Sequence, residues 1–175
     1  MRQRLIMTAA VLMLLGVMPT TAAGQEIEAQ HADFSGTWTL DRGASEIPQG
    51  RGGRRGGGRF GGEGPATVTI TQTDDEVVME QQGGGQSRTL TYRLDGSPSE
   101  NPGPRGGVAI MTSSWDDATL VTEGLRTIST PRGEFTLESH ERRLLSDGSQ
   151  TMIIITTLTT PRGDVRARLV YRVAD

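Results

Sequence analysis

The stretch VRARLVYRV at positions 165–173 alternates apolar side chains with arginines. Successive side chains of an extended strand point to opposite faces, so the arginines collect on one face and the apolar side chains on the other. The apolar face holds Val165, Ala167, Leu169, Tyr171 and Val173. This pattern predicts a β-strand with one buried face and one solvated face, which is typical of an antiparallel sheet.

Turn sequences separate further segments of the same kind. TPRG at 160–163 repeats at 130–133, and both copies place proline and glycine where a type I or II turn uses them. TDDE, GGG, WDDA and SDGS supply further Asp and Gly between runs rich in threonine, valine and isoleucine. The sequence therefore predicts nine strands, at 34–40, 66–73, 76–82, 86–94, 107–115, 118–128, 133–144, 149–159 and 165–173.

The short links predict that each strand pairs with its predecessor in an antiparallel meander. Such a meander has two exposed edges, which closure into a barrel removes. We expect an all-β fold, a single up-and-down meander barrel of eight to nine strands, with a two-sheet sandwich as the alternative. Alternation of loops between the two ends then places 41–65, 83–85, 116–117 and 146–148 at one end, and 95–106 at the other.

The N-terminus has the order of an export signal. Arg2 and Arg4 are followed by the apolar run Leu5–Met18, and Pro19 then precedes small residues that offer a cleavage site. The run is short for a membrane span of roughly 20 residues, so an uncleaved anchor is the less favoured interpretation. We expect residues 1–24 to be removed as a signal peptide and the mature protein to be periplasmic or extracellular, without a transmembrane span.

The remaining length of about 150 residues suits one domain with its own core. The chain contains no cysteine, which excludes disulfides, thiolate metal sites and cysteine nucleophiles. We divide it into a signal peptide at 1–24, a polar tail at 25–32 and a lipocalin-like barrel domain at 33–175 with a flexible Gly/Arg-rich loop at 48–65. Nothing in the sequence indicates the oligomeric state.

The stretch GRGGRRGGGRFGGEG at 50–64 resembles an RNA-binding segment in composition. Its charge is +3, whereas the whole chain carries −3. After removal of residues 1–24 the mature chain would carry −5, which leaves −8 outside this stretch. Nucleic-acid-binding domains normally present a basic folded surface, so we expect no specific nucleic-acid partner.

DFSGTWTLD at 33–41 resembles the first strand of the lipocalin-like (calycin) barrels, which carries a Gly-x-Trp motif. The chain also resembles a group of exported bacterial lipocalin-like proteins of unknown function over most of its mature length. That resemblance rests on the order of FSGTW, LDGSPSENPG at 94–103, WDD at 115–117 and LVYR at 169–172.

The resemblance implies that Trp38 closes the base of the barrel and packs against an arginine from the final strands. Arg168 and Arg172 lie on the face opposite Tyr171, however, and an ordinary core position is the alternative for Trp38. The resemblance also implies that the loop at 48–65 covers the ligand entrance. An insertion without a task is the alternative, since loop length costs little entropy.

We find no catalytic or metal-binding constellation in the sequence. His140 and Glu138 share a strand face, but a solvated face explains them better than an acid–base or metal pair. The aspartates lie in turns, where they bind backbone amides, without the spacing of a calcium loop. We therefore expect a non-enzymatic protein without cofactor or metal.

Two function classes stay open. A barrel of this size encloses about one small ligand, so the first hypothesis is a carrier of a small hydrophobic molecule. Its expected ligand-binding residues are Trp38, Tyr92, Phe135 and Tyr171, with Leu90, Leu137 and Leu169 facing the same way. The second hypothesis is a cell-envelope structural or interaction protein whose Arg/Gly-rich loop contacts acidic polymers or lipid headgroups. A ligand-sized cavity favours the first, and a filled barrel the second.

Overall fold

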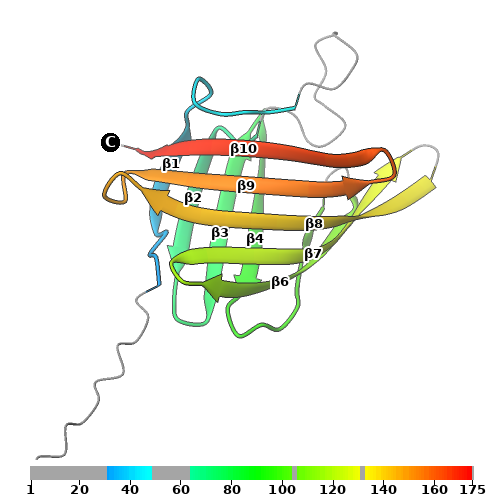
Figure 1. Ribbon diagram of the computed structural model, residues 1–175, viewed down its shortest axis with the longest axis horizontal. Helices are drawn as coiled ribbons and strands as arrows, with labels where there is room; N and C mark the ends of the chain where they lie inside the picture. Colours follow the sequence, from blue (N-terminus) through cyan, green and yellow to red (C-terminus); the bar gives the residue numbers. More distant parts are fainter. Residues whose placement is uncertain (1–30, 49–63, 104–105, 131–132, 175) are drawn as a thin grey trace, which may run out of the picture.

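The computed structural model describes residues 31–48, 64–103, 106–130 and 133–174, which form ten β-strands (Figure 1). Threonine, valine and isoleucine dominate these strands, as their branched side chains fit a pleated surface. The strands are β1 (Gly36–Leu40), β2 (Thr67–Gln72), β3 (Glu76–Gly83), β4 (Gln86–Arg93), β5 (Ser99–Pro102), β6 (Val108–Asp116), β7 (Thr119–Thr130), β8 (Gly133–Ser146), β9 (Thr151–Thr160) and β10 (Gly163–Val173).

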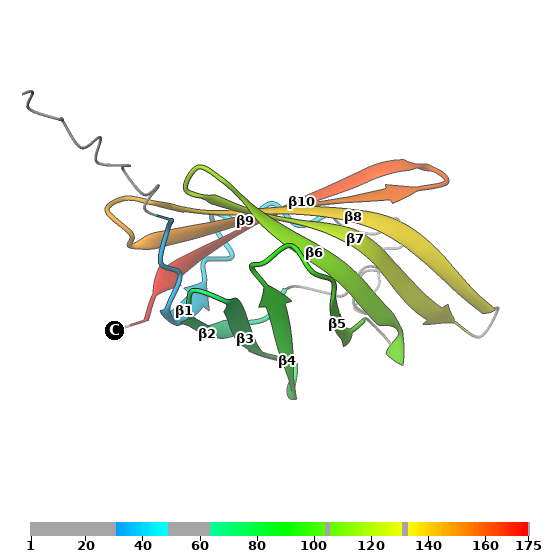
Figure 2. The same ribbon diagram turned by 90° about the horizontal axis from the view of Figure 1, so that it is seen from below.

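All ten strands belong to one antiparallel sheet in the order β4-β3-β2-β1-β10-β9-β8-β7-β6-β5. Pairing between β1 and β10 closes the meander, with Trp38 opposite Val173 and Leu40 opposite Tyr171. The strands β6–β10 cross in front of β1–β4, so the two halves of the sheet face each other (Figures 1 and 2). The predicted all-β up-and-down barrel is confirmed, and it is closed except between β4 and β5.

The predicted number of eight to nine strands was wrong because the sequence hides β5. Pro98 and Pro102 bracket Ser99–Asn101, and prolines at both ends are typical of a loop. The extra strand exchanges the ends at which later loops lie. The turns at 117–118 and 147–150 therefore lie opposite the segment that follows β1, and not beside it as predicted.

Aromatic side chains close the end of the barrel at which β1 begins. Trp38 is 2% exposed, and its Nε1 donates to the Phe34 carbonyl at 2.9 Å. The Phe34 ring lies parallel to that of Trp115 with their centroids 6.0 Å apart, and His31 stacks on Trp115 at 4.4 Å. The side chain of Gln72 accepts from the Phe34 backbone at 3.0 Å. The expected burial of Trp38 at a closed end is thus confirmed.

The opposite end is open, and the β7–β8 and β9–β10 hairpins extend beyond it (Figures 1 and 2). The segment after β1 continues along β10, where Glu46 and Arg168 exchange two backbone hydrogen bonds of 2.7 and 2.8 Å. The chain returns at Gly64, and the Tyr171 hydroxyl donates to the Pro65 carbonyl at 3.2 Å. Both ends of the Gly/Arg-rich stretch are therefore anchored at the open end.

Several predictions concern residues outside the described ranges. These are the signal peptide at 1–24, most of the tail at 25–32, and the core of the Gly/Arg-rich loop at 49–63. In the part of the chain that is described, no helix has the length and apolar character needed to cross a membrane.

Candidate functional site

Strand β8 brings charged side chains into the barrel. Leu137, Ser139, Glu141 and Arg143 are buried and alternate with more exposed neighbours, as one face of a strand must. Glu141 and Arg143 therefore share the inner face with apolar side chains. The sequence analysis missed them, although the parity of Leu137 alone would have placed both inside.

Glu141 is the centre of an inner hydrogen-bonded cluster. Its Oε1 accepts from Arg143 Nη2 at 2.6 Å, and its Oε2 receives Arg126 Nη2 at 3.4 Å and the Thr156 hydroxyl at 3.2 Å. These contacts join β7, β8 and β9 across the inside of the barrel. The bond to Arg143 is short and charge-assisted, whereas the bond to Arg126 is long and weak.

Arg143 is held between two aromatic rings. Its guanidinium carbon lies 5.9 Å from the centroid of Phe34 and 5.4 Å from that of Tyr92, within the range of cation–π attraction. The side chain is 1% exposed. The arginine at the closed end thus comes from β8. The expected partners of Trp38 on β10 point outward instead, where Arg168 donates to the Ala44 carbonyl and Arg172 contacts Asp41.

The inner face carries more positive than negative charge. Among the described strand residues, the inward positions hold three arginines, Arg88, Arg126 and Arg143, and one carboxylate, Glu141. Arg88 Nε donates to Gln81 at 2.7 Å. Arg126 Nε and both Nε and Nη1 of Arg143 are buried and donate to no acceptor in the described protein. Buried donors of this kind normally have a partner, so the barrel has an unmet capacity to bind an anion.

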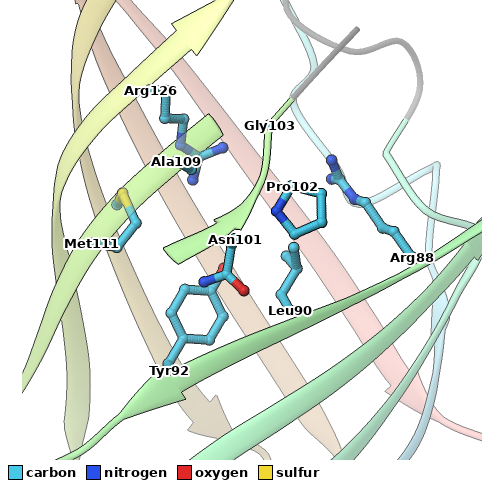
Figure 3. Close-up of a pocket in the computed structure, with 9 residues that line it drawn as sticks. All are labelled: Arg88, Leu90, Tyr92, Asn101, Pro102, Gly103, Ala109, Met111 and Arg126. Carbon is cyan, nitrogen blue, oxygen red and sulfur yellow. The ribbon is translucent and has the colours of Figure 1, made fainter. Parts of the chain in front are cut away.

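A small pocket lies beside two of these arginines (Figure 3). It is formed by β4, β5, β6 and β7 and has a volume of about 20 Å³. This is room for about one water molecule. Its lining residues are Arg88, Leu90, Tyr92, Asn101, Pro102, Gly103, Ala109, Met111 and Arg126. The pocket thus joins an apolar wall to two guanidinium groups.

Both tyrosines of the protein lie on the inner face. Burial, reinforced by the negative charge of Glu141, raises the pKa of Tyr92 and of Tyr171 above the ordinary 10.0. Both phenols are therefore neutral at physiological pH and can donate hydrogen bonds.

We predict that the raised tyrosine pKa values make the protein unstable in alkali. Between pH 10 and the folded-state pKa values, the folded protein binds phenolic protons that the unfolded chain has released, so the free energy of unfolding falls as pH rises above about 10. Absorbance of tyrosinate in the near ultraviolet, followed together with circular dichroism, checks this. Tyrosinate should appear only as the fold is lost; ionisation of both tyrosines in a folded protein would contradict it.

The four residues predicted to bind a ligand lie in different places. Tyr92 is buried and lines the pocket, and Tyr171 is buried on the inner wall. Trp38 lies in the closed end, away from the pocket lining. Phe135 has inward parity, opposite Ile128, but is 43% exposed on the projecting β7–β8 hairpin. Their role in ligand binding stays a prediction.

The histidines form no site of the kind considered for the sequence. His140 Nε2 contacts Glu123 Oε1 at 3.2 Å across β7 and β8, and both side chains are well exposed on the outer face. Glu138, the partner considered from the sequence, lies opposite Leu125 and Thr159. Within the described ranges, no group of three or more His, Asp or Glu side chains is arranged to hold a metal ion.

Solved structures share this arrangement of strands. A protein described as the REP1-NXSQ fatty acid transporter matches with a TM-score of 0.56 and 16% identity, covering 82% of this chain and 97% of its own. The fold is that of a calycin barrel. Its structural neighbours are of the fatty-acid-binding type, which corrects the specifically lipocalin-like expectation.

Two further matches extend the comparison. Caenorhabditis elegans lipid binding protein 8 matches with a TM-score of 0.56 and 13% identity over 81% of this chain and 95% of its own. Zebrafish ileal bile acid-binding protein with cholic acid matches with a TM-score of 0.50 and 13% identity over 81% of this chain and 98% of its own. No known protein family and no curated protein matches the sequence.

Proposed function

We propose that this protein is a non-enzymatic carrier that binds a small amphipathic molecule inside its barrel, with the anionic group of the ligand on the inner arginines. One observation carries the proposal, the excess of buried guanidinium donors over inner carboxylates. The apolar wall of the pocket, with Leu90, Ala109 and Met111, supplies the surface for the rest of the ligand.

The energetics favour an anionic ligand over a neutral one. A buried cation without a counter-ion is costly, and Glu141 neutralises at most one of three inner arginines. A ligand carboxylate would supply a second counter-ion and accept hydrogen bonds from planar guanidinium groups. Arg126 is the best placed of the three, because its contact with Glu141 is long and its Nε has no acceptor.

The similar structures support the same class of ligand. Their descriptions name a fatty acid transporter, a lipid binding protein and a bile acid-binding protein in complex with cholic acid. Fatty acids and cholic acid combine an apolar body with a carboxylate. The likeness extends to the fold only, so the charge of the inner face of this chain is the independent support.

The small size of the pocket sets a condition on this proposal. A volume of about 20 Å³ is far below the roughly 300 Å³ of a typical ligand pocket, so the barrel has to widen around a ligand. A barrel that stays filled would favour the alternative of an envelope structural or interaction protein. Binding measurements separate these two functions.

We predict that a fluorescent carboxylate, dansylaminoundecanoic acid, binds at one molecule per barrel. Its methyl ester should bind about tenfold or more weakly, because it lacks the charge that pairs with Arg126. Arg126→Gln should remove this preference for the acid. Arg166→Gln, on the exposed outer face of β10, is the matched control and should bind like the wild type. Equal affinity for acid and ester would refute the anionic site, and no saturable binding of either would favour the structural alternative.

We further propose that the protein acts outside the cytoplasm after removal of residues 1–24. The basic, apolar and small-residue order of this segment supports export. Sequencing the N-terminus of protein recovered from the producing cells should give a start within a few residues of Gln25. A membrane-bound protein that still begins at Met1 would contradict cleavage.

A further inference from the structure

The barrel has one seam, between β4 and β5. Backbone pairing joins every other pair of neighbouring strands, including β1 with β10. Both seam strands are fully described, and no backbone hydrogen bond joins them. On its other side β5 pairs with β6 over only four positions, Ser99 to Pro102.

Two side chains of β5 take the place of the missing backbone partner. Asn101 Oδ1 accepts from the Thr91 backbone N–H at 2.7 Å, and its Nδ2 donates to the Thr91 carbonyl at 2.8 Å. The Ser99 hydroxyl accepts from the Arg93 backbone N–H at 2.8 Å. Asn101 thus reproduces with its amide the pair of bonds that a strand residue would exchange with Thr91. Three side-chain hydrogen bonds hold the seam.

The pocket lies directly behind this seam. Asn101 and Pro102 from β5 and Leu90 and Tyr92 from β4 form its wall, as Figure 3 shows. Ala109, Met111 and Arg126 lie on the strands behind them. Separation of β4 from β5 would therefore enlarge the pocket and open it to the outside in one movement.

The open end offers less room on the side of β1 and β10. The segment that leads into β2 lies against the inner wall there, and a Cβ built at Gly64 would come within 3.3 Å of Leu169 and 3.7 Å of Leu40. Gly64 has a positive φ of 64°, which suits glycine at this close approach. Pro65 is fixed beside it by the Tyr171 hydroxyl.

We infer that ligands enter and leave the barrel through the β4–β5 seam, and that Asn101 is the residue that controls its opening. This inference rests on the proposed function. Breaking three side-chain hydrogen bonds frees β5 from β4 while all backbone pairs of the sheet stay intact. The same movement provides the volume that the resting pocket lacks.

A reducible crosslink across the seam tests this route. The chain has no cysteine, so Thr91→Cys and Glu100→Cys introduce two unique thiols at outward positions of β4 and β5. They are joined by a short bis-maleimide with an internal disulfide. Stopped-flow fluorescence with dansylaminoundecanoic acid should show association and dissociation slowed at least about tenfold, with an unchanged Kd, and reductant should restore both rates.

Two further variants complete the test. The matched control joins Thr112→Cys to Glu123→Cys, an outward pair on β6 and β7 that backbone bonds already hold, and it should exchange the probe at the wild-type rate. Asn101→Ala should speed association and dissociation by about tenfold, since it removes two of the three seam bonds, whereas Glu100→Ala should not.

The failures of the two proposals are distinguishable. Wild-type exchange rates in the seam-linked protein, with circular dichroism showing an intact fold, would overturn the seam route while binding itself stands. Absence of saturable binding in the uncrosslinked wild type would overturn the proposed function and the route with it.

Discussion

Replacement of Trp38 by alanine is expected to lower the free energy of unfolding by about 3–5 kcal/mol. The indole is almost completely buried where β1 meets β2 and β10, with Val68 and Val173 opposite it on the two neighbouring strands. Alanine would leave a cavity at the closed end, and the Phe34 carbonyl would lose the hydrogen bond from the indole. Both effects destabilise only the folded state.

Denaturant unfolding at constant slope measures this loss. Thr39→Ala, the exposed neighbour on the same strand, is the control and should change stability by less than about 0.5 kcal/mol. Trp38→Phe should fall between the two, because it keeps most of the ring volume but removes the donor to Phe34. A loss near zero for the alanine variant would show that Trp38 does not hold the closed end together.

Glu141→Gln is expected to cost about 3–5 kcal/mol, because it leaves a buried charge without its counter-ion. Arg143 is 1% exposed, and its only hydrogen bond to a charged partner in the described protein is the 2.6 Å contact with Glu141. The aromatic rings on either side of the guanidinium cannot replace a full negative charge. Arg126 is less affected, since its side chain still reaches solvent.

A double mutant separates loss of the pair from loss of the charge balance. Glu141→Gln combined with Arg143→Met removes both buried charges, and it should be more stable than Glu141→Gln alone. Glu138→Gln, on the outer face of β8, is the matched control and should have little effect on unfolding. A double mutant less stable than the single one would mean that Arg143 stabilises the core by itself.

The alternation of side chains made most of the fold predictable. The last strand shows why, since the parity of Val165 to Val173 in the sequence is the parity of the inner wall in the structure. Pairing of successive strands and burial of Trp38 follow from the same local reasoning. The count of strands failed at Ser99–Pro102, where pairing depends on β6 and on the side-chain bonds of Asn101 and not on local composition.

The candidate site was harder to predict because it is defined by partners on different strands. Tyr92 was expected to face a ligand, and it does line the pocket. Arg88 and Arg126 read individually as solvated charges, since arginine is usually exposed. Only the sheet register brings Arg126 opposite Leu137 and beside Glu141, and this register depends on the extra strand that the sequence conceals.

The binding of the ligand's anionic group by inner arginines is tested most directly by the side-chain NMR signals of isotopically labelled protein. On titration with dansylaminoundecanoic acid, the Nε–Hε signal of Arg126, assigned by its loss in Arg126→Gln, should shift and saturate at one ligand per protein. The methyl ester should leave this signal in place, and the signals of the outer Arg162 and Arg166 should not respond to either ligand. An Arg126 signal that stays unchanged while the acid binds, or that responds equally to acid and ester, would contradict the account.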